Sequence, residues 1–513
     1  MLRQTLLLCV LLLPAPLYAA TFYVGASATG AGTGTSTSNL CGGLADADCT
    51  PSAGDTVYLC GAFTAQMAPQ AVNGTAGNVI TYDFDCDGNP ATLTFDASAD
   101  RGLYISSKSY LTINNARVTG ATGVGGSNDT GLISIALSTH ITLNSPTTYN
   151  NTAASAARGL SVRTSSDVTI NDAVSYGNYG HGIIINNDST RIVVDGFTTY
   201  NNRRTGIQFE GFSTHDSLTY SSASHGLTYG NGNGCYAIIG DHITFDDIIS
   251  YGNDNVLGDG EGYGCAIQQV TNATVSNMTV YDNRSDGIEV WGNTSLSAAD
   301  CRVFSNTVYN HTGYGDDSGS NGIEVRTGYS PGCHIYGNLL FNNTKNFRLG
   351  NDSTGTSRLT HNTTYGGTYS LRMVDSNEAG TNAVTGWTIA NNIFDTPLTY
   401  WLYTDVTSAN SNTFAKNDWA GSKSSVYNNT TYTTADITTV DSTGVTTSPA
   451  YVGTDRTLSA SYRLMPGSSL TNISALRGPC ADARGRACPP DRPNIGAYQS
   501  TSGDPAATRS ARN

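Results

Sequence analysis

A short run of alternating apolar residues recurs along this chain, and its spacing constrains the fold more than any other feature. GLSVR begins at Gly159, GIIIN at Gly182 and GIQFE at Gly206, so the first two steps are 23 and 24 residues. We align five further runs with these, beginning at Ala266, Gly287, Gly322, Asn346 and Ser370. A motif that recurs every ~20 to 50 residues is typical of solenoids, because one unit cannot bury its apolar face alone and must stack on its neighbours.

A second motif indicates that the repeated unit is built from strands. It places an aromatic residue two positions before asparagine or histidine, as in SYGN at Ser175, TYNN at Thr199 and VYNH at Val308. Alternation with a period of two, bounded by Asn and Gly, is the pattern of short strands and turns. No stretch shows the long 3.6-residue periodicity of a helix, so we predict an all-β solenoid.

These features resemble the right-handed parallel β-helix of secreted polysaccharide lyases and related glycosidases. GDTVYLCGAFTAQ, from Gly54, is similar to the first coil of that family, and YRLMPGSSLTNI with DRPNIGAYQ resembles a C-terminal module of many bacterial β-helix proteins. The resemblance implies a right-handed parallel β-helix of about 10–12 coils with loop insertions on one face. We expect a cap and first coils at 21–110, a central β-helix at 111–400 and C-terminal β-rich coils or a module at 401–500. The composition of residues 501–513 predicts a disordered tail.

The first residues predict export. Arg3 precedes an apolar run from about Leu6 to Leu13, and Ala19 and Ala20 follow, which is the pattern of a signal peptide over residues 1–20. We therefore expect a secreted protein, extracellular or periplasmic, with no later segment apolar enough to span a membrane. Of eleven cysteines one lies in the signal peptide, so ten remain for disulfides in an oxidising compartment. The sequence leaves their connectivity open, and neighbouring positions suggest the pairs Cys41–Cys49, Cys60–Cys86, Cys235–Cys265, Cys301–Cys333 and Cys480–Cys488.

The charge balance limits the partners of the protein. Its formal net charge is −14, which disfavours binding to nucleic acid. If the substrate is anionic, local arginines or a bound cation must offset the overall negative field. We expect a monomer that acts on an acidic polysaccharide.

The sequence Gly-Ile-Glu-Val occurs twice, in SDGIEVW from Ser285 and in SNGIEVRTG from Ser320. In a strand the Ile and Val side chains would point into the coil, and Glu289 and Glu324 would point out. On adjacent coils these carboxylates would stand about 5 Å apart, where like charges destabilise unless a cation, a shared proton or an arginine offsets them. Our alignment puts Gln268, Arg348 and Arg372 on other coils at the position that Glu289 and Glu324 occupy. Trp291 and Arg326 occupy the next outward position, two residues further along the strand.

Oxygen-bearing residues near the pair predict a calcium site. We assign Glu324, Asn321, Asp286, Asp316 and Asp317 as its ligands. The segment NGIEVRTG is similar to the Asn-x-x-Glu-x-Arg segment of the alginate and chondroitin lyase family, in which the Asn and Glu help to bind calcium. The resemblance therefore implies Asn321 and Glu324 in particular. The Asn-Lys-Ser signature that follows in that family is absent from this chain.

These residues favour a lyase that cleaves a uronate-containing polysaccharide by β-elimination. In such lyases a cation or an arginine neutralises the uronate carboxylate and a base removes the α-proton; fixed positive charge lowers the barrier where negative charge develops. GEGYGCAIQQ followed by SDGIEVW also looks like the pectate lyase branch, although Gln268 and Gln269 stand where its base lysine is expected. Our hypothesis assigns catalysis to Arg348, Arg326, Lys345 and Glu289, and substrate binding to Trp291, Arg372 and Gln268.

Two other functions remain open at this point. A β-helix glycoside hydrolase would use two carboxyl groups among Glu289, Glu324 and Asp286 as acid and base, and their separation would set the stereochemical outcome. A non-catalytic carbohydrate-binding or adhesion solenoid would need no catalyst, since one fold hosts many functions.

Overall fold

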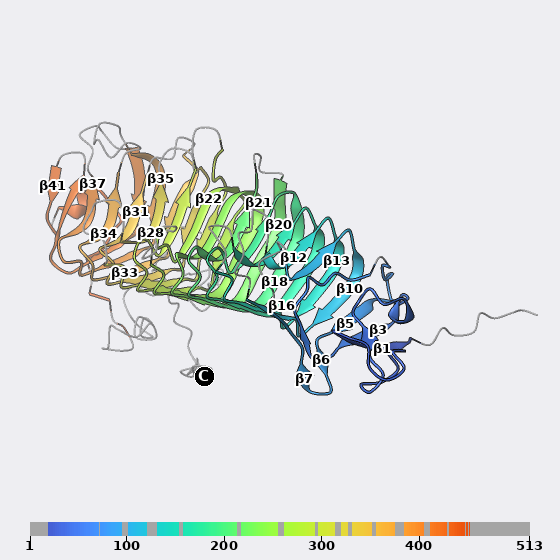
Figure 1. The fold of residues 1–513 in the computed structure, drawn as a ribbon. Coiled ribbons are helices and arrows are strands. Elements are labelled where there is room, and N and C mark those ends of the chain that lie inside the picture. Colours follow the sequence, from blue (N-terminus) through green and yellow to red (C-terminus); the bar gives the residue numbers. More distant parts are fainter. Residues whose placement is uncertain are drawn as a thin grey trace, which may run out of the picture.

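The chain forms a parallel β-solenoid of about 11 turns, whose coils stack in chain order from one end to the other (Figure 1). This confirms the predicted all-β parallel β-helix. The predicted domain boundaries stay predictions. Residues 1–18 of the predicted signal peptide, residues 452–500 of the predicted C-terminal module and the predicted tail lie outside the described residues. The computed structural model describes residues 19–451 apart from 71, 95–100, 121–130, 153–156, 213–216, 255–260, 293–295, 313–319, 327–330, 351–354, 375–383, 405–410, 428–429, 435, 447 and 450.

Each coil contributes a strand to as many as three faces, and neighbouring strands along each face are parallel. The first face carries the repeated apolar runs of the sequence. It consists of β9 (Leu103–Ser106), β12 (Gly131–Ala136), β15 (Arg158–Arg163), β17 (Ile183–Asn186), β19 (Thr205–Glu210), the start of β21 (Asn233–Tyr251), β22 (Cys265–Thr271), β25 (Ile288–Trp291), β28 (Asn321–Arg326), β31 (Lys345–Leu349), β34 (Tyr369–Met373), β37 (Tyr400–Thr404) and β40 (Ser424–Tyr427).

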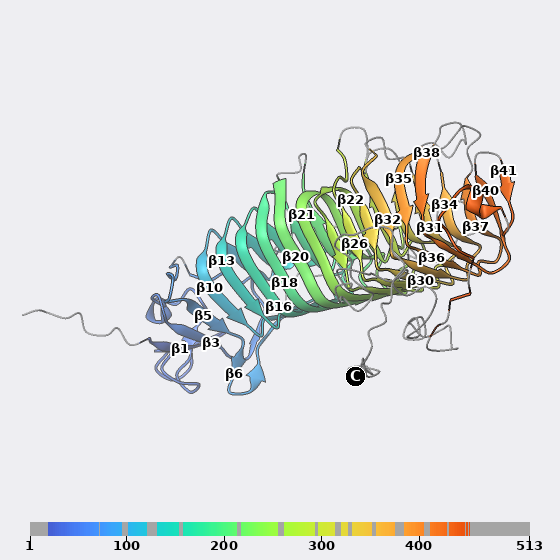
Figure 2. The ribbon, with the colours of Figure 1, turned by 180° about the vertical axis from the view of Figure 1, so that it is seen from behind.

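The second face follows the first in each coil, and Figure 2 shows its strands β32, β35 and β38 side by side. It consists of β1 (Thr21–Gly25), β3 (Thr56–Leu59), β5 (Ile80–Asp83), β10 (Ser109–Asn114), β13 (Thr139–Asn144), the first halves of β16 (Ser166–Tyr176), β18 (Ser189–Tyr200) and β20 (Leu218–Tyr229), the middle of β21, β23 (Thr274–Ser276), β26 (Arg302–Phe304), β29 (His334–Tyr336), β32 (Ser357–Thr360), β35 (Thr385–Ala390) and β38 (Ser411–Ala415).

The third face closes each coil. It consists of β4 (Ala62–Phe63), β8 (Thr92–Thr94), β11 (Arg117–Thr119), β14 (Thr147–Tyr149), the ends of β16, β18, β20 and β21, β24 (Thr279–Tyr281), β27 (Thr307–Tyr309), β30 (Leu339–Phe341), β33 (Thr363–Tyr365), β36 (Ile393–Asp395) and β39 (Asp418–Ala420). Outside the faces lie β2 (Cys41–Gly42), the hairpin of β6 (Asp85–Cys86) and β7 (Asn89–Pro90), β41 (Thr430–Tyr432) and the 3-10 turns η1 (Ala47–Cys49) and η3 (Ile437–Thr439). Since helical structure among the described residues is limited to such short turns, none of it reaches the length of a membrane crossing.

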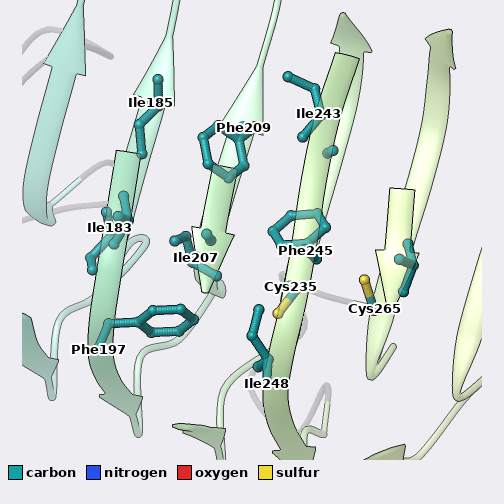
Figure 3. Packing of buried hydrophobic residues seen from close by; sticks show 14 of the residues in the cluster. Ile183, Ile185, Phe197, Ile207, Phe209, Cys235, Ile243, Phe245, Ile248 and Cys265 are labelled. Atoms are coloured by element: carbon teal, nitrogen blue, oxygen red, sulfur yellow. The ribbon is translucent and has the colours of Figure 1, made fainter. Parts of the chain in front are cut away.

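Inward side chains of successive coils stack in rows that fill the solenoid. On the first face Ile183, Ile207, Cys235, Cys265 and Ile288 follow one another in register, and all are fully buried. Figure 3 shows the first four of these side chains beside the rings of Phe197, Phe209 and Phe245. Burying one aliphatic side chain of this size contributes about 1.5–3 kcal/mol, so stacking is what stabilises units that are too small to fold alone.

The aromatic-and-asparagine motif forms two further rows. The tyrosines of the motif stack face to face on successive coils, as in Tyr176 and Tyr200 with ring centroids 4.6 Å apart. The asparagines lie inside the coil, where the Asn178 amide donates to Asn202 at 2.9 Å and the Asn253 amide donates to Asn283 at 2.8 Å. This asparagine ladder satisfies buried backbone and side-chain groups at each bend, which explains why the motif recurs.

The glycine that opens each run lies where two coils come closest. A Cβ on Gly287 would lie 2.6 Å from the Gly322 carbonyl oxygen, and a Cβ on Gly264 would lie 2.6 Å from the Gly287 oxygen. The coil that we aligned at Ala266 therefore begins at Gly264. The long step from Gly206 to Ala266 contains one more coil, which begins at Gly234. Variable loop lengths between coils caused this error. They change the spacing of the runs in the sequence, but they do not change which residues are paired between neighbouring strands.

Three of the suggested disulfides are present: Cys41–Cys49, Cys60–Cys86 and Cys301–Cys333. Cys480 and Cys488 lie outside the described residues. The suggested Cys235–Cys265 bond is wrong, because both are buried free thiols (Figure 3). They are paired in register within β21 and β22, where the hydrogen-bonded ladder aims both side chains in the same direction rather than toward each other.

Candidate functional site

The two Gly-Ile-Glu-Val runs form β25 and β28 on adjacent coils of the first face. Glu289 is in register with Glu324, Glu324 with Arg348, and Arg348 with Arg372. We call these four residues the central row. The sequence alignment placed all four correctly relative to one another, and Figure 1 shows the strands β28, β31 and β34 that carry three of them in succession.

Two shorter rows flank the central row. Asn321 and Lys345 are in register with each other at the starts of β28 and β31, and Asp286 lies just before β25. On the other side Trp291 is in register with Arg326. Each coil therefore brings several polar side chains to the same region of the first face.

Gln268 does not occupy the predicted place in the central row. Ala266 lies opposite Glu289, and Gln268 lies opposite Trp291, because that coil begins two residues earlier than we aligned it. Gln268 still contacts the site, since its Nε2 donates to Glu289 Oε2 at 2.9 Å. Its contact is therefore with a carboxylate of the protein, whereas we expected a contact with substrate.

Three carboxylates form the centre of the site. Asp286, Glu289 and Glu324 each offer an oxygen within 4.8 Å of the others, and we call them the acidic cluster. Asn321 links two of them: its Nδ2 donates to Asp286 Oδ1 at 2.8 Å and to Glu324 Oε2 at 2.7 Å. The other predicted ligands, Asp316 and Asp317, lie outside the described residues.

The acidic cluster is buried, whereas we expected its side chains to face solvent. Asp286, Glu289 and Glu324 are all 0% exposed. Burial raises the pKa of Asp286 to about 6 and that of Glu289 to about 7, because a charged carboxylate loses its hydration there. Alternation along a strand shows which side chains leave the coil, but it does not show how deeply they are covered.

Arginines offset part of this negative charge. Arg326 Nε lies 3.0 Å from Glu324 Oε1 and 3.3 Å from Glu289 Oε1. Arg348 also forms an ion pair with Glu324 through Nη1. Arg348 and Lys345 are each only 2% exposed, whereas the Arg326 side chain is 31% exposed. Of these three cations, Arg326 is therefore the one placed to reach a molecule on the surface.

Two tyrosines belong to the site and were missed from the sequence. The Tyr263 hydroxyl donates to Glu289 Oε1 at 3.4 Å, and the Tyr236 hydroxyl donates to Gln268 Oε1 at 2.5 Å. Burial raises the pKa of both phenols above the ordinary value, and the Glu289 charge raises it further, so both stay protonated. Aligning the coil at Gly264 puts Tyr263 one position before the opening glycine, where Asp286 stands before Gly287, and that register would have revealed it.

The donor set fits a hard divalent cation. Asp286 Oδ2 and Asn321 Oδ1 are buried and accept no hydrogen bond from a described residue. Such unpaired oxygens cost free energy when they are buried, and carboxylate and amide oxygens are the ligands that Ca²⁺ prefers. A cation beside the acidic cluster would satisfy Asp286 Oδ2 and would oppose the burial that raises the pKa of Glu289.

No protein-family model matches this chain, and no curated protein matches it. Among solved structures, the pectate lyase Pel9A is similar at 13% sequence identity, over 94% of this chain and 96% of that chain, with a TM-score of 0.36. An alginate lyase from Paenibacillus sp. str. FPU-7 is similar at 18% identity, over 61% of this chain and 99% of that chain, with a TM-score of 0.41. The periplasmic alginate epimerase AlgG is similar at 13% identity, over 70% and 76% of the two chains, with a TM-score of 0.42. At these identities the likeness concerns the β-helix fold.

Proposed function

We propose that this protein is a secreted enzyme that cleaves an acidic, uronate-containing polysaccharide by β-elimination. The observation that carries the proposal is the contact of Arg326 and Arg348 with a buried acidic cluster on one wall of the solenoid. The central row changes from acidic to basic between two successive coils, from Glu324 on β28 to Arg348 on β31. The three disulfides support an oxidising compartment.

Arg326 is the group that we assign to the substrate carboxylate. Two carboxylates fix its position, so its guanidinium is oriented before substrate arrives and needs little reorganisation. Negative charge builds on the uronate carboxylate as the C5 proton passes to a base from solvent. The C4–O bond then breaks, its electron pair leaves with the departing oxygen, and that oxygen takes a proton from solvent. Trp291 lies in register on the neighbouring coil and is partly exposed, which suits it to pack against a sugar ring.

Asp286, Glu289 and Glu324, with Asn321, are the residues that we propose to hold a divalent cation such as Ca²⁺. Because these ligands are buried, a cation among them would add positive charge through its electric field, without direct contact with the substrate carboxylate. Lys345 and Arg348, which we predicted to be catalytic, are too deeply buried for direct contact with substrate. We assign them instead to keeping the acidic cluster ionised.

One observation favours a glycoside hydrolase as the second candidate. Oxygens of Glu289 and Glu324 lie within 4.8 Å of each other. With its pKa raised to about 7, Glu289 would carry a proton in about half of the molecules at neutral pH. A retaining glycosidase requires such an acid and carboxylate about 5 Å apart. Both groups are 0% exposed, however, so neither contacts a glycosidic oxygen without rearrangement, and we prefer the lyase.

Incubation of the protein with pectate, alginate and glucuronan tests the proposal. Ultraviolet absorbance of the 4,5-unsaturated product and new reducing ends are measured in parallel, with added Ca²⁺ and with EDTA. A lyase produces both signals together, whereas a hydrolase produces reducing ends alone. A binding solenoid would produce neither signal with any of the three polymers, and that result would refute an enzyme of this class.

The variant Arg326→Gln tests the assigned residue. We expect about a 100-fold or greater loss of cleavage, the usual cost of removing one group that stabilises developing charge. Arg191→Gln is the matched control, since Arg191 is an exposed arginine on the second face that pairs with Asp167 at 2.7 Å. Wild-type turnover in Arg326→Gln, or an equal loss in the control, would remove Arg326 from the mechanism.

A further inference from the structure

A second row of basic side chains stands on a different wall of the solenoid. Arg302 on β26 is in register with His334 on β29, and His334 is in register with Arg358 on β32. We call these three residues the basic row. Both arginines are exposed and His334 is partly exposed. The row lies on the second face, whereas the acidic cluster lies on the first.

The basic row lacks counter-charges in contact with it. Within the described part of the chain, neither the Arg302 nor the Arg358 guanidinium forms an ion pair or a side-chain hydrogen bond. Exposed Arg191, also on the second face, pairs with Asp167 at 2.7 Å, and partly exposed Arg284 pairs with Asp254 at 3.1 Å. In a chain of net charge −14, a stack of unpaired cations is unexpected, because like charges on neighbouring strands destabilise a sheet.

Burial and the neighbouring charges determine the protonation state of His334. Burial lowers the pKa of His334, and Arg358 and Arg302 lower it further, while exposed Asp300 acts weakly in the other direction. His334 is therefore neutral at neutral pH. Its ring N–H hydrogen-bonds the Thr356 backbone, so the other ring nitrogen offers an acceptor between two permanent cations.

The surroundings of the basic row suit a sugar polymer. Thr274 continues the row on one side and Thr388 on the other, so hydroxyl groups extend it along the axis. Two residues further along the strands, Phe304 and Tyr336 stack with ring centroids 4.9 Å apart and planes at 5°. Both rings are partly exposed beside the guanidinium groups, which gives an apolar edge next to charged and hydroxyl groups.

We propose that Arg302, His334 and Arg358 form a second binding site for the acidic polysaccharide, separate from the acidic cluster. Successive coils are about 4.8 Å apart, so a polymer lying along the axis meets a new side chain at each coil. Guanidinium groups bind carboxylates in a two-pronged geometry, and the neutral His334 binds a hydroxyl. The choice of ligand rests on the proposed substrate class.

The consequence for the enzyme is tethering. A polymer held on the second face keeps its other segments near the first face, at an effective concentration set by the length of chain between the two sites. A short oligosaccharide cannot span both sites and gains nothing. The basic row should therefore affect the KM for polymer and leave the kcat/KM for a short oligosaccharide unchanged.

The double variant Arg302→Gln/Arg358→Gln tests the inference. Native electrophoresis through gels containing pectate or alginate measures binding, and gels containing dextran, a neutral polymer, measure binding that does not depend on acid groups. We expect about tenfold weaker retention by the acidic polymers, from the loss of two exposed charge contacts, and an effect that shrinks as salt is added. Unchanged thermal melting shows that the variant is folded.

Arg117→Gln/Arg191→Gln is the matched control, since it removes two exposed positive charges elsewhere on the solenoid. Equal retention of the wild-type protein and the basic-row variant would overturn the inference, and so would an equal loss in the control or equal retention by dextran. Absence of any cleavage product, together with retention that needs Arg302 and Arg358, would refute the proposed function and leave the second site standing.

Discussion

The asparagine ladder contains one histidine, and its surroundings predict a loss of stability in mild acid. His311 is fully buried where neighbouring coils have asparagine. Its Nε2 lies 3.2 Å from Asn283 Nδ2, and its Nδ1 lies 2.8 Å from Asn343 Oδ1. Because the Asn283 amide nitrogen can only donate, His311 Nε2 must accept, which fixes the neutral tautomer with the proton on Nδ1. A second proton, on Nε2, would face the N–H groups of Asn283 Nδ2, and water could not solvate the resulting charge. Burial accordingly lowers the pKa of His311 to about 4.

The size of this loss of stability follows from the linkage between proton binding and unfolding. The pKa of histidine in the unfolded chain is about 6.5, so the unfolded state binds a proton before the folded state as the pH falls. The stability contributed by neutral His311 is complete above about pH 6.5 and is lost as the pH falls toward about 4. The full difference of about 2.5 pKa units corresponds to about 3.4 kcal/mol, of which about 2 kcal/mol is lost between pH 7 and pH 5.

The assay is urea unfolding of the wild-type protein and of His311→Asn at pH 7 and pH 5. The asparagine restores the ladder residue of the other coils and does not titrate. His361 is also buried with its pKa lowered to about 4, but it is present in both proteins and its effect cancels. We expect the wild-type protein to lose about 2 kcal/mol more than the variant between the two pH values. Equal losses in the two proteins would refute the reasoning.

Three further predictions concern the site and the packing of the coils. Arg348→Ala should cost about 3 kcal/mol of unfolding free energy, because it removes the buried one of the two arginines that pair with Glu324. The same assay on Arg348→Met/Glu324→Gln should recover most of that loss, and no recovery would contradict the pairing argument. Gly287→Ala should destabilise by at least about 1–3 kcal/mol, since its Cβ would meet the next coil at 2.6 Å, and a wild-type melting temperature would contradict that packing. Alkylation of the unreduced, denatured protein followed by mass spectrometry should label Cys235 and Cys265; a disulfide-linked peptide pair would instead support the pairing suggested by the sequence.

Much of the fold follows from local sequence signals. The alternation in GIEV and its recurrence required stacked parallel coils, since no single run could bury its apolar side. The same recurrence placed Glu289, Glu324, Arg348 and Arg372 in one row, because the loops between their coils do not disturb the register of the strands. Where the opening residue was ambiguous, at Ala266, the alignment slipped by two and misplaced Gln268.

The chemistry of the site depended on tertiary structure. A period of two distinguishes the two sides of a strand, but it carries no information about depth, so the burial of Glu289 and its raised pKa were not visible in the sequence. Nor did the sequence place Arg358 in one row with Arg302 and His334 on another wall, since it lies outside the runs that define the repeat. The sequence by itself determined which side chains stack from coil to coil. Only the tertiary structure decided which of them are buried. Burial matters because it removes water from the three carboxylates of the acidic cluster, which raises the pKa of Glu289 and favours a bound cation.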